Sequence, residues 1–366
     1  MELRFSLLRS LLRCVLLSTP VFALVLIAGP AVAQDEEFAD LSLEDMLELE
    51  LDAVSIAGIH HTHDAGEWMV GFSYMNMAMN GMRNGTNRVS TSDVTDPAQF
   101  NFRVSPVKMD MHMLMFHLMY APSDKITLMG MMPYVRKSMK HVTRMGANFT
   151  TRAEGAGDLK LAALYSAYRT ESQRVITEFG LSLPSGSIVE KDNNPMSMGA
   201  DVRLPYPMQL GSGTVDFLPG VTYIGQTTSW QWGGHVKGTV RVGKNANGYR
   251  LGNRYKLTSW VSRTFTDMLS GSVRLDWNQW FNIQGRDPRQ DGAVMGPMAP
   301  VVPTAFTNLQ AGKRLDLLVG VTLYEPAGAL RGHLLSLEAG LPIYQYIDGP
   351  QLETDWMLSL SWYWTI

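Results

Sequence analysis

Cysteine is nearly absent from the chain: Cys14 is the only one in 366 residues. The sequence after residue 33 therefore offers no disulfide, no thiolate nucleophile and no thiolate metal site. The formal net charge is only -3, which gives no argument for a nucleic-acid partner. No apolar run beyond residue 33 is long enough for a transmembrane helix. Disulfide-rich scaffolds and helical membrane proteins are thus excluded as classes.

The first 33 residues differ in composition from the rest. Three arginines precede or flank an apolar run at Val15–Ile27, and Ala31-Val32-Ala33 supplies small residues after it. This order predicts a secretory signal peptide, residues 1–33, cleaved after Ala33. The alternative is an N-terminal membrane anchor, which the short, proline-interrupted run disfavours. A secreted chain without disulfides or spanning helices is either a periplasmic soluble protein or an outer-membrane β-barrel.

From Trp68 onward the chain alternates apolar and polar side chains with a period of two. Such segments are typical of strands with one apolar and one polar face. Short turns near residues 121–125, 170–173, 228–229, 267–270 and 328–331 alternate with long polar loops at 81–107, 146–157, 185–212, 244–253 and 285–312. This asymmetry is the signature of a membrane barrel with periplasmic turns and extracellular loops.

The strand rhythm predicts an all-β fold, a transmembrane antiparallel up-and-down β-barrel of about 12 strands at residues 67–366. The strands are expected to begin near residues 67, 109, 126, 158, 174, 213, 230, 254, 270, 313, 333 and 353. Residues 34–66, with a short helix at 41–51, are expected to form a periplasmic or lumen-tucked segment. A soluble β-sandwich is the alternative. The barrel reading places the protein in the bacterial outer membrane, in contact with its lipids.

The last strand, WMLSLSWYWTI at residues 356–366, carries an unbroken apolar and aromatic row on one face. Outward aromatic residues at strand ends are typical of an interfacial girdle. The segment resembles the carboxy-terminal signal that the barrel assembly machinery recognises, which predicts this machinery as a partner. The usual pattern ends in Phe or Trp, and Ile366 departs from it.

Two segments, GDLKLAALY at 157–165 and FGLSLPSGS at 179–187, resemble the outer-membrane β-barrel family related to the meta-pathway phenol degradation transporter. Length and strand rhythm are compatible over the rest of the chain. The resemblance implies a β-barrel and a channel for small molecules, aromatic ones included. It implies no catalytic residues and no cofactor.

Methionine is locally enriched: fifteen of the 24 methionines lie between Met69 and Met145. In MDMHMLMFHLMY, residues 109–120, methionine recurs at every second position, and so shares one face of a strand. Tyr120 belongs beside the periplasmic turn on the lipid side, so the methionines are expected to face inward. The same reasoning predicts inward rows on the two neighbouring strands.

Thioether and imidazole ligands suit soft cations such as Cu or Ag ions. The parity argument predicts a luminal track formed by Met75, Met77, Met111, Met113, Met115, His117, Met129, Met131 and His141. The alternative is that methionine is a flexible apolar filler, or contacts a hydrophobic or aromatic solute. A register error of one residue would turn any row toward lipid. A second candidate metal site is His60-His61-Thr62-His63-Asp64, for which a solvated linker is the alternative.

Enzyme motifs are absent from the sequence, which contains no G-x-S-x-G, phosphate-binding loop or cysteine nucleophile. We therefore predict no enzyme, but a channel or transporter for a small solute or metal ion. A structural or blocked barrel is the alternative, and an outer-membrane enzyme the remotest one. The polar wall of the channel is expected to carry Lys160, Glu178, Arg274, Asp276, Asp316 and Glu338.

Overall fold

The computed structural model describes residues 64–290 and 300–366. The chain divides into two compact units, Met1–Glu36 and Glu37–Ile366, and every described residue belongs to the second. The expected signal peptide, the short helix at 41–51 and the histidines at 60–63 lie outside the described residues. Those three expectations therefore stay predictions.

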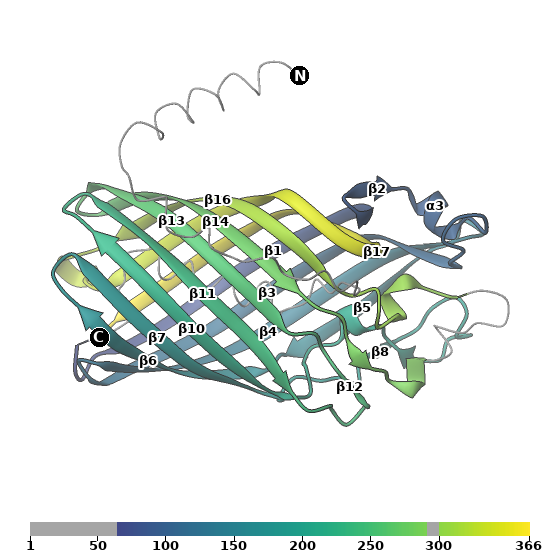
Figure 1. Cartoon of the computed structure of the whole chain (residues 1–366), viewed down its shortest axis with the longest axis horizontal. Helices are drawn as coiled ribbons and strands as arrows, with labels where there is room; N and C mark the ends of the chain where they lie inside the picture. Colours follow the sequence, from purple (N-terminus) through teal and green to yellow (C-terminus); the bar gives the residue numbers. More distant parts are fainter. Residues whose placement is uncertain (1–63, 291–299) are drawn as a thin grey trace, which may run out of the picture. The chain divides into compact units, whose positions relative to one another are not determined.

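The described part of the chain is dominated by one antiparallel sheet that closes on itself (Figure 1), and two small two-stranded sheets lie outside it. Each strand pairs with its neighbour along the chain, and the last strand pairs with the first. Closure satisfies the backbone hydrogen bonds of every strand, which is the condition for spanning a bilayer with strands. The eleven strands of the closed path are β1 (Trp68–Gly85), β3 (Val104–Ser123), β4 (Ile126–Thr143), β6 (Leu159–Arg169), β7 (Gln173–Leu183), β10 (Val215–Gln226), β11 (Trp230–Val242), β13 (Arg254–Thr266), β14 (Leu269–Trp280), β16 (Gly312–Tyr324) and β17 (His333–Thr365).

Strand β17 doubles back on itself. Its first half pairs with β16 and its second half with β1, both antiparallel, and Ile347 is the turning point shared by the two registers. Gln345 and Thr354 exchange hydrogen bonds of 2.8 and 2.9 Å across this hairpin. The chain therefore runs from one rim of the barrel to the other twelve times, as the sequence predicts. Both ends of the described barrel lie at one rim, where Ile366 N donates to Trp68 O at 2.8 Å.

Short turns join the strands at that rim, and long segments join them at the opposite rim except for the tight turn within β17, so the expected asymmetry of the connections is confirmed. Two expected loops are partly wrong: β1 and β3 extend into 81–107, and residues 146–157 form a strand. We call the rim with the short turns the lower rim and the opposite one the upper rim. Strand β5 (Asn148–Ala156) pairs with the upper half of β4, and β6 pairs with its lower half. The additional elements are β2 (Asn87–Val89), α3 (Thr91–Thr95), β5 (Asn148–Ala156), β8 (Lys191–Asp192), β9 (Val202–Arg203), η1 (Tyr206–Met208), β12 (Tyr249–Arg250), β15 (Gln284–Gly285), η2 (Pro288–Gln290), η3 (Pro303–Ala305) and η4 (Gly328–Leu330).

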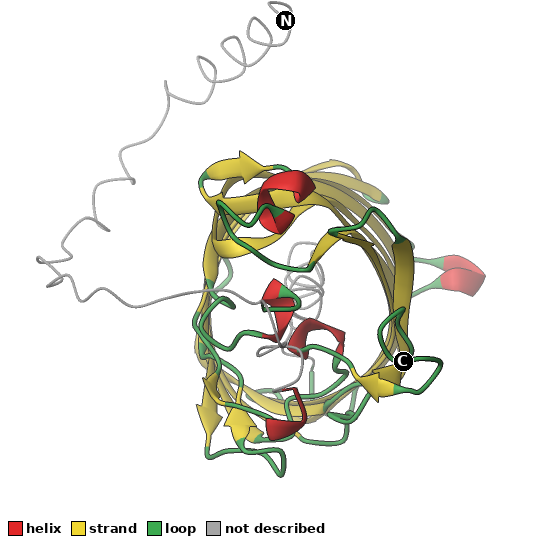
Figure 2. Ribbon diagram, turned by 90° about the vertical axis from the view of Figure 1, so that its right-hand side faces the viewer, coloured by secondary structure: helices red, strands yellow, loops and turns green. Residues whose placement is uncertain are grey.

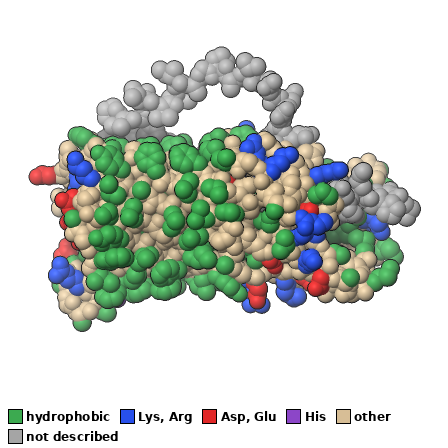
Figure 3. Space-filling model, turned by 90° about the horizontal axis from the view of Figure 1, so that it is seen from below, with side chains coloured by type: hydrophobic (Ala, Val, Ile, Leu, Met, Phe, Trp, Pro, Cys, Tyr) green, Lys and Arg blue, Asp and Glu red, His purple; other side chains and the backbone are tan. Residues whose placement is uncertain are grey.

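The outer surface of the barrel is apolar. Side chains such as Phe72, Leu114, Leu128 and Tyr134 are 47–56 % exposed on this face. Hydrophobic side chains cover one side of the barrel broadly in Figure 3. Lysine, arginine and acidic side chains gather toward its two ends. An apolar band on a closed barrel matches a position in the bacterial outer membrane. None of the helices among the described residues is long and apolar enough to cross a bilayer.

The long connections at the second rim fold partly into the barrel. Seen along the barrel, short helices and loops lie inside the ring of strands (Figure 2). Helices η1 and η3 are buried over their full length. The interior is therefore shaped by loops as well as by the strands.

Candidate functional site

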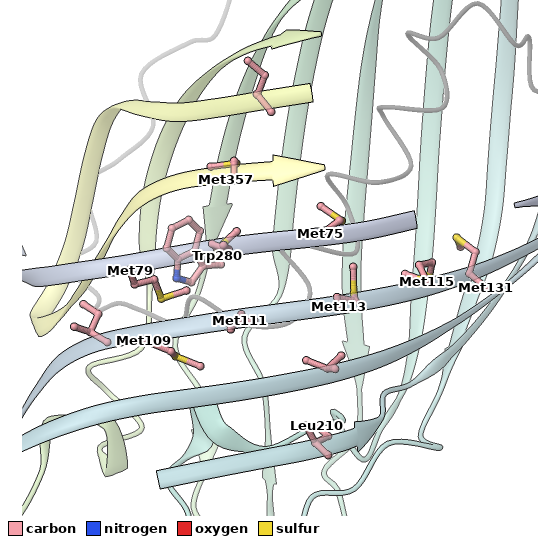
Figure 4. Packing of buried hydrophobic residues seen from close by; sticks show 14 of the residues in the cluster. Met75, Met79, Met109, Met111, Met113, Met115, Met131, Leu210, Trp280 and Met357 are labelled. Carbon is pink, nitrogen blue, oxygen red and sulfur yellow. The ribbon is translucent and has the colours of Figure 1, made fainter. Parts of the chain in front are cut away.

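Methionine dominates the inward face of three adjacent strands, β1, β3 and β4. This surface, the methionine wall, comprises Met69, Met75, Met77, Met79, Met109, Met111, Met113, Met115, Met119, Met129, Met131 and Met139. Each is at most 7 % exposed, whereas the alternating residues Leu114, Phe116 and Leu118 are 37–56 % exposed. The expected facing of the methionine rows is thereby confirmed. Figure 4 shows methionines of the cluster, among them Met75, Met113 and Met357, which come from neighbouring strands.

The register of the strands places methionines side by side. Met75 pairs with Met113, and Met77 pairs with Met111 on one side and with Met357 of β17 on the other. Paired residues on one face of an antiparallel sheet have Cβ atoms about 4.5–5.5 Å apart. The thioethers thus form groups that extend across neighbouring strands, rather than three separate lines that each follow one strand.

The two histidines of the expected track lie in different surroundings. His117 is buried on the inward face, opposite Met131 on β4, with its ring 5.5 Å from that of Tyr363. His141 lies near the far end of β4 and stacks on Phe149 of β5 at 4.7 Å. All nine expected track residues are thus buried, but His141 belongs to an aromatic stack near the long-loop end. Whether the track binds metal stays a prediction.

The remaining strands line the interior with charge. This charged wall comprises Lys160, Glu178, Asp216, Lys237, Arg241, Lys256, Arg274, Asp276, Arg314, Asp316 and Glu338, all at most 6 % exposed. Cations and carboxylates alternate across its strands in ion pairs. Lys237 and Glu178 lie 2.8 Å apart, Arg314 and Asp316 2.8 Å, and Arg274 pairs with Glu338. The six polar residues expected from the sequence all belong to this wall.

One cation interrupts the methionine wall. Lys137 of β4 occupies the position beside Met111, and its Nζ donates to the carbonyls of Pro207 and Gln209 at 2.8 and 2.6 Å. These carbonyls belong to the connection between β7 and β10, around η1. Lys137 therefore holds an inward-folded segment against the methionine wall, which the strand pattern of the sequence does not indicate.

The two motif segments at 157–165 and 179–187 meet at the base of this same connection. Asp158 accepts hydrogen bonds from Gly186 N and Ser212 N, both at 2.8 Å, and from Ser212 Oγ at 2.7 Å. Ser185 Oγ in turn donates to Gly157 O at 3.0 Å. The motif thus fixes both ends of the connection, residues 184–214, to the barrel wall.

Sequence reasoning missed Met357 as a member of the methionine cluster, because its neighbours on the last strand are serines and aromatic residues. Within residues 64–290 and 300–366, no three His, Cys, Asp or Glu side chains are grouped so as to hold a metal ion.

Comparison with solved structures shows a related fold. An outer membrane channel from Pseudomonas putida F1 superposes with a TM-score of 0.56 at 14 % identity, covering 84 % of this chain and 98 % of that chain. A FadL homologue from Pseudomonas aeruginosa gives a TM-score of 0.39 at 10 % identity, covering 82 % and 89 %. The translocator domain of autotransporter NalP from Neisseria meningitidis gives 0.44 at 11 %, covering 88 % and 95 %. These likenesses concern the fold, and only the first is close enough to support it.

No curated protein sequence matches the chain. A family model, in contrast, matches residues 92–301, which is more than half of the chain. The matched span includes both motif segments, the methionine strand β3 and most of the charged wall. The protein is an outer-membrane β-barrel, and it belongs to the family described as "Putative MetA-pathway of phenol degradation".

Proposed function

We propose that the protein is a passive outer-membrane channel for a small solute. The observation that carries the proposal is the division of the barrel interior into a methionine wall and a charged wall. Methionine side chains are flexible and polarizable, so they adapt to apolar surfaces of varied shape. The ion pairs opposite them supply fixed hydrogen-bonding groups for a polar or charged end of the solute.

The solute class is proposed from the same two walls. A small aromatic molecule with one polar or charged group has a face for each wall, and sulfur–aromatic contacts are favourable. The family description refers to phenol degradation, and the Pseudomonas putida protein is described as an outer membrane channel. The first description favours a small aromatic compound as the solute, and the second favours a channel. Soft metal ions are the second solute class, favoured by the adjacent thioethers of the methionine wall.

Conductance in planar lipid bilayers tests the proposal. The full-length protein, refolded in detergent, should produce discrete single-channel steps, and proteoliposomes should swell in isosmotic sodium benzoate. The matched control is the same preparation after heat denaturation, which should do neither. A folded barrel that gives no steps and no swelling would instead be a structural or blocked barrel.

A further inference from the structure

Three rows of the methionine wall each bring three thioethers to one level of the barrel. The lower row is Met69, Met119 and Met129; the middle row is Met357, Met77 and Met111; the upper row is Met79, Met109 and Met139. In every row the three residues stand directly opposite one another on three consecutive strands. All nine are at most 7 % exposed.

We propose that each of these three rows binds one soft monovalent cation, Cu(I) or Ag(I), through three thioether sulfurs. The proposal deepens the proposed function, on which it rests for the route of the ion into the barrel. Neighbouring Cβ atoms in a row are about 4.5–5.5 Å apart. Three unbranched side chains at that spacing have enough rotational freedom to turn their sulfurs toward one point.

The chemistry of the donors selects the ion. Thioethers are soft, neutral ligands that suit Cu(I), and they offer little to Mg²⁺ or Ca²⁺, which prefer oxygen. They need no deprotonation to bind, in contrast to cysteine or histidine. The rows would therefore hold a soft cation weakly and release it readily, as a channel requires.

Filling the interior with apolar volume does not by itself explain the choice of methionine. From the lower to the upper row, strands β1, β3 and β4 have eighteen inward positions in all. Methionine occupies four of the six on β1, five of the six on β3 and three of the six on β4. None of the eighteen is leucine, isoleucine or phenylalanine. On the outward face of the same stretch, methionine occurs once, at Met132, and leucine and phenylalanine are common.

Soft donors also lie between the middle and the lower row. Going down the wall from the middle row, the first pair of inward positions holds Met75 beside Met113. The next inward position down on β3 is Met115, and the one after it is His117, which lies beside Met131 of β4. Successive levels are two residues apart, or about 7 Å along a strand. The ten residue steps from Met69 to Met79 thus span about 33 Å along the strand, and about 25 Å across a membrane after a typical strand tilt. An ion could pass from row to row over the height of the apolar band.

The middle row should bind most weakly. Lys137 occupies the next position of that row on β4, and its ammonium group lies among the carbonyls of Pro207 and Gln209. A cation bound at Met111 would experience repulsion from this charge. The positions next to the upper row are Thr354 and Thr151, and those next to the lower row are Thr365 and Ala162, so neither of these rows has an ionisable neighbour in the register.

Titration of the refolded full-length barrel with silver nitrate in chloride-free buffer tests the three sites. Wild-type protein should bind three Ag(I) in the barrel, with X-ray absorption showing about three sulfur neighbours per ion. Replacing one row by leucine, for example Met79→Leu, Met109→Leu and Met139→Leu, should remove one of the three ions. The matched control replaces Met132, Met145 and Met268, which are 37–95 % exposed, by leucine. It should keep all three ions.

Leucine preserves size and apolarity, and heat-modifiable migration verifies that each variant folds. Ag(I) should also protect the methionines of each row from peroxide oxidation in the wild-type protein, as measured by mass spectrometry. This measurement needs no variant. Unchanged Ag(I) stoichiometry in all three row variants, or no protection of the row methionines, would overturn the proposal. Benzoate-driven swelling without Ag(I) binding would support the channel and refute the three metal sites. Ag(I) binding without conductance would support the metal sites and refute the channel.

Discussion

Gly71 shows how one missing side chain shapes the methionine wall. A Cβ atom at this position would lie 2.2 Å from Cδ1 and 2.6 Å from Cε1 of Tyr363, the residue opposite it on β17. Because glycine leaves this space open, the fully buried ring of Tyr363 lies over its backbone. The Tyr363 hydroxyl is then 3.1 Å from Ser73 Oγ. The glycine therefore lets a tyrosine close the lower part of the seam between the first and last strands.

Substituting Gly71→Ala should destabilise the barrel, because the added methyl group must displace the Tyr363 ring or the backbone. Overpacking of this kind costs about 1–3 kcal/mol. Urea unfolding of the barrel in lipid vesicles, followed by tryptophan fluorescence, measures the change. Gly130→Ala on β4 is the control, since its nearest contact is Leu161 Cδ2 at 3.6 Å. A loss for Gly130→Ala as large as that for Gly71→Ala would contradict this account.

At the scale of elements, the connection between β7 and β10 is attached to the wall at both its base and its middle. Asp158 binds the base, and Lys137 binds the carbonyls next to η1. Leu204, Met208 and Leu210 of the connection belong to the same buried cluster as the methionine wall. The segment is therefore the part of the described interior best placed to narrow the route of a solute.

Replacing Lys137→Met should loosen this segment while extending the methionine wall. Hydrogen bonds from a charged donor contribute about 1.5–3 kcal/mol each, so loss of two should raise the opened fraction by roughly a hundredfold or more. We expect higher single-channel conductance and faster trypsin cleavage after Arg203. Lys140→Met is the control, because Lys140 lies on the same strand but is exposed on its outer face. Equal behaviour of the two variants would show that Lys137 does not hold the segment.

At the scale of the molecule, the seam between β1 and β17 makes the sheet a barrel. Its register runs from Met69 opposite Thr365 to Gly85 opposite Ile347. Without this pairing two long strand edges would be open, and lipid cannot satisfy their hydrogen bonds.

Deleting residues 356–366 should therefore abolish the folded form. The measurement is migration on a denaturing gel before and after boiling, together with recovery in the outer-membrane fraction. Ile366→Phe should fold like the wild type, because Ile366 contributes backbone hydrogen bonds to Trp68 and its side chain is exposed. A truncated chain that still shows heat-modifiable migration would disprove the role assigned to the seam.

Local patterns predict which face of each strand points inward. The alternation along residues 109–119 puts Met111, Met113 and Met115 on one face and Leu114 on the other, and the expected lipid-side position of Tyr120 turns the methionines inward. The reason is that successive side chains of any strand point to opposite faces, whichever strands become its neighbours. The number of wall crossings, the starts of most strands and the charged residues of the interior are predictable on the same grounds. Metal binding by the expected track stays a prediction.

Contacts across the sheet have a different origin, because the register depends on hydrogen bonds between strands far apart in the chain. Nothing in the neighbourhood of Met357 indicates that it will stand beside Met77, 280 residues away. The contact of Lys137 with Pro207 is likewise not indicated by the sequence near either residue. Strand β5 has the polarity of a loop, and it forms a strand because it pairs with β4. The faces of the strands follow from local stereochemistry. The grouping of sulfurs into rows of three follows instead from the register between neighbouring strands, and for the middle row also from closure of the barrel, which brings Met357 beside Met77.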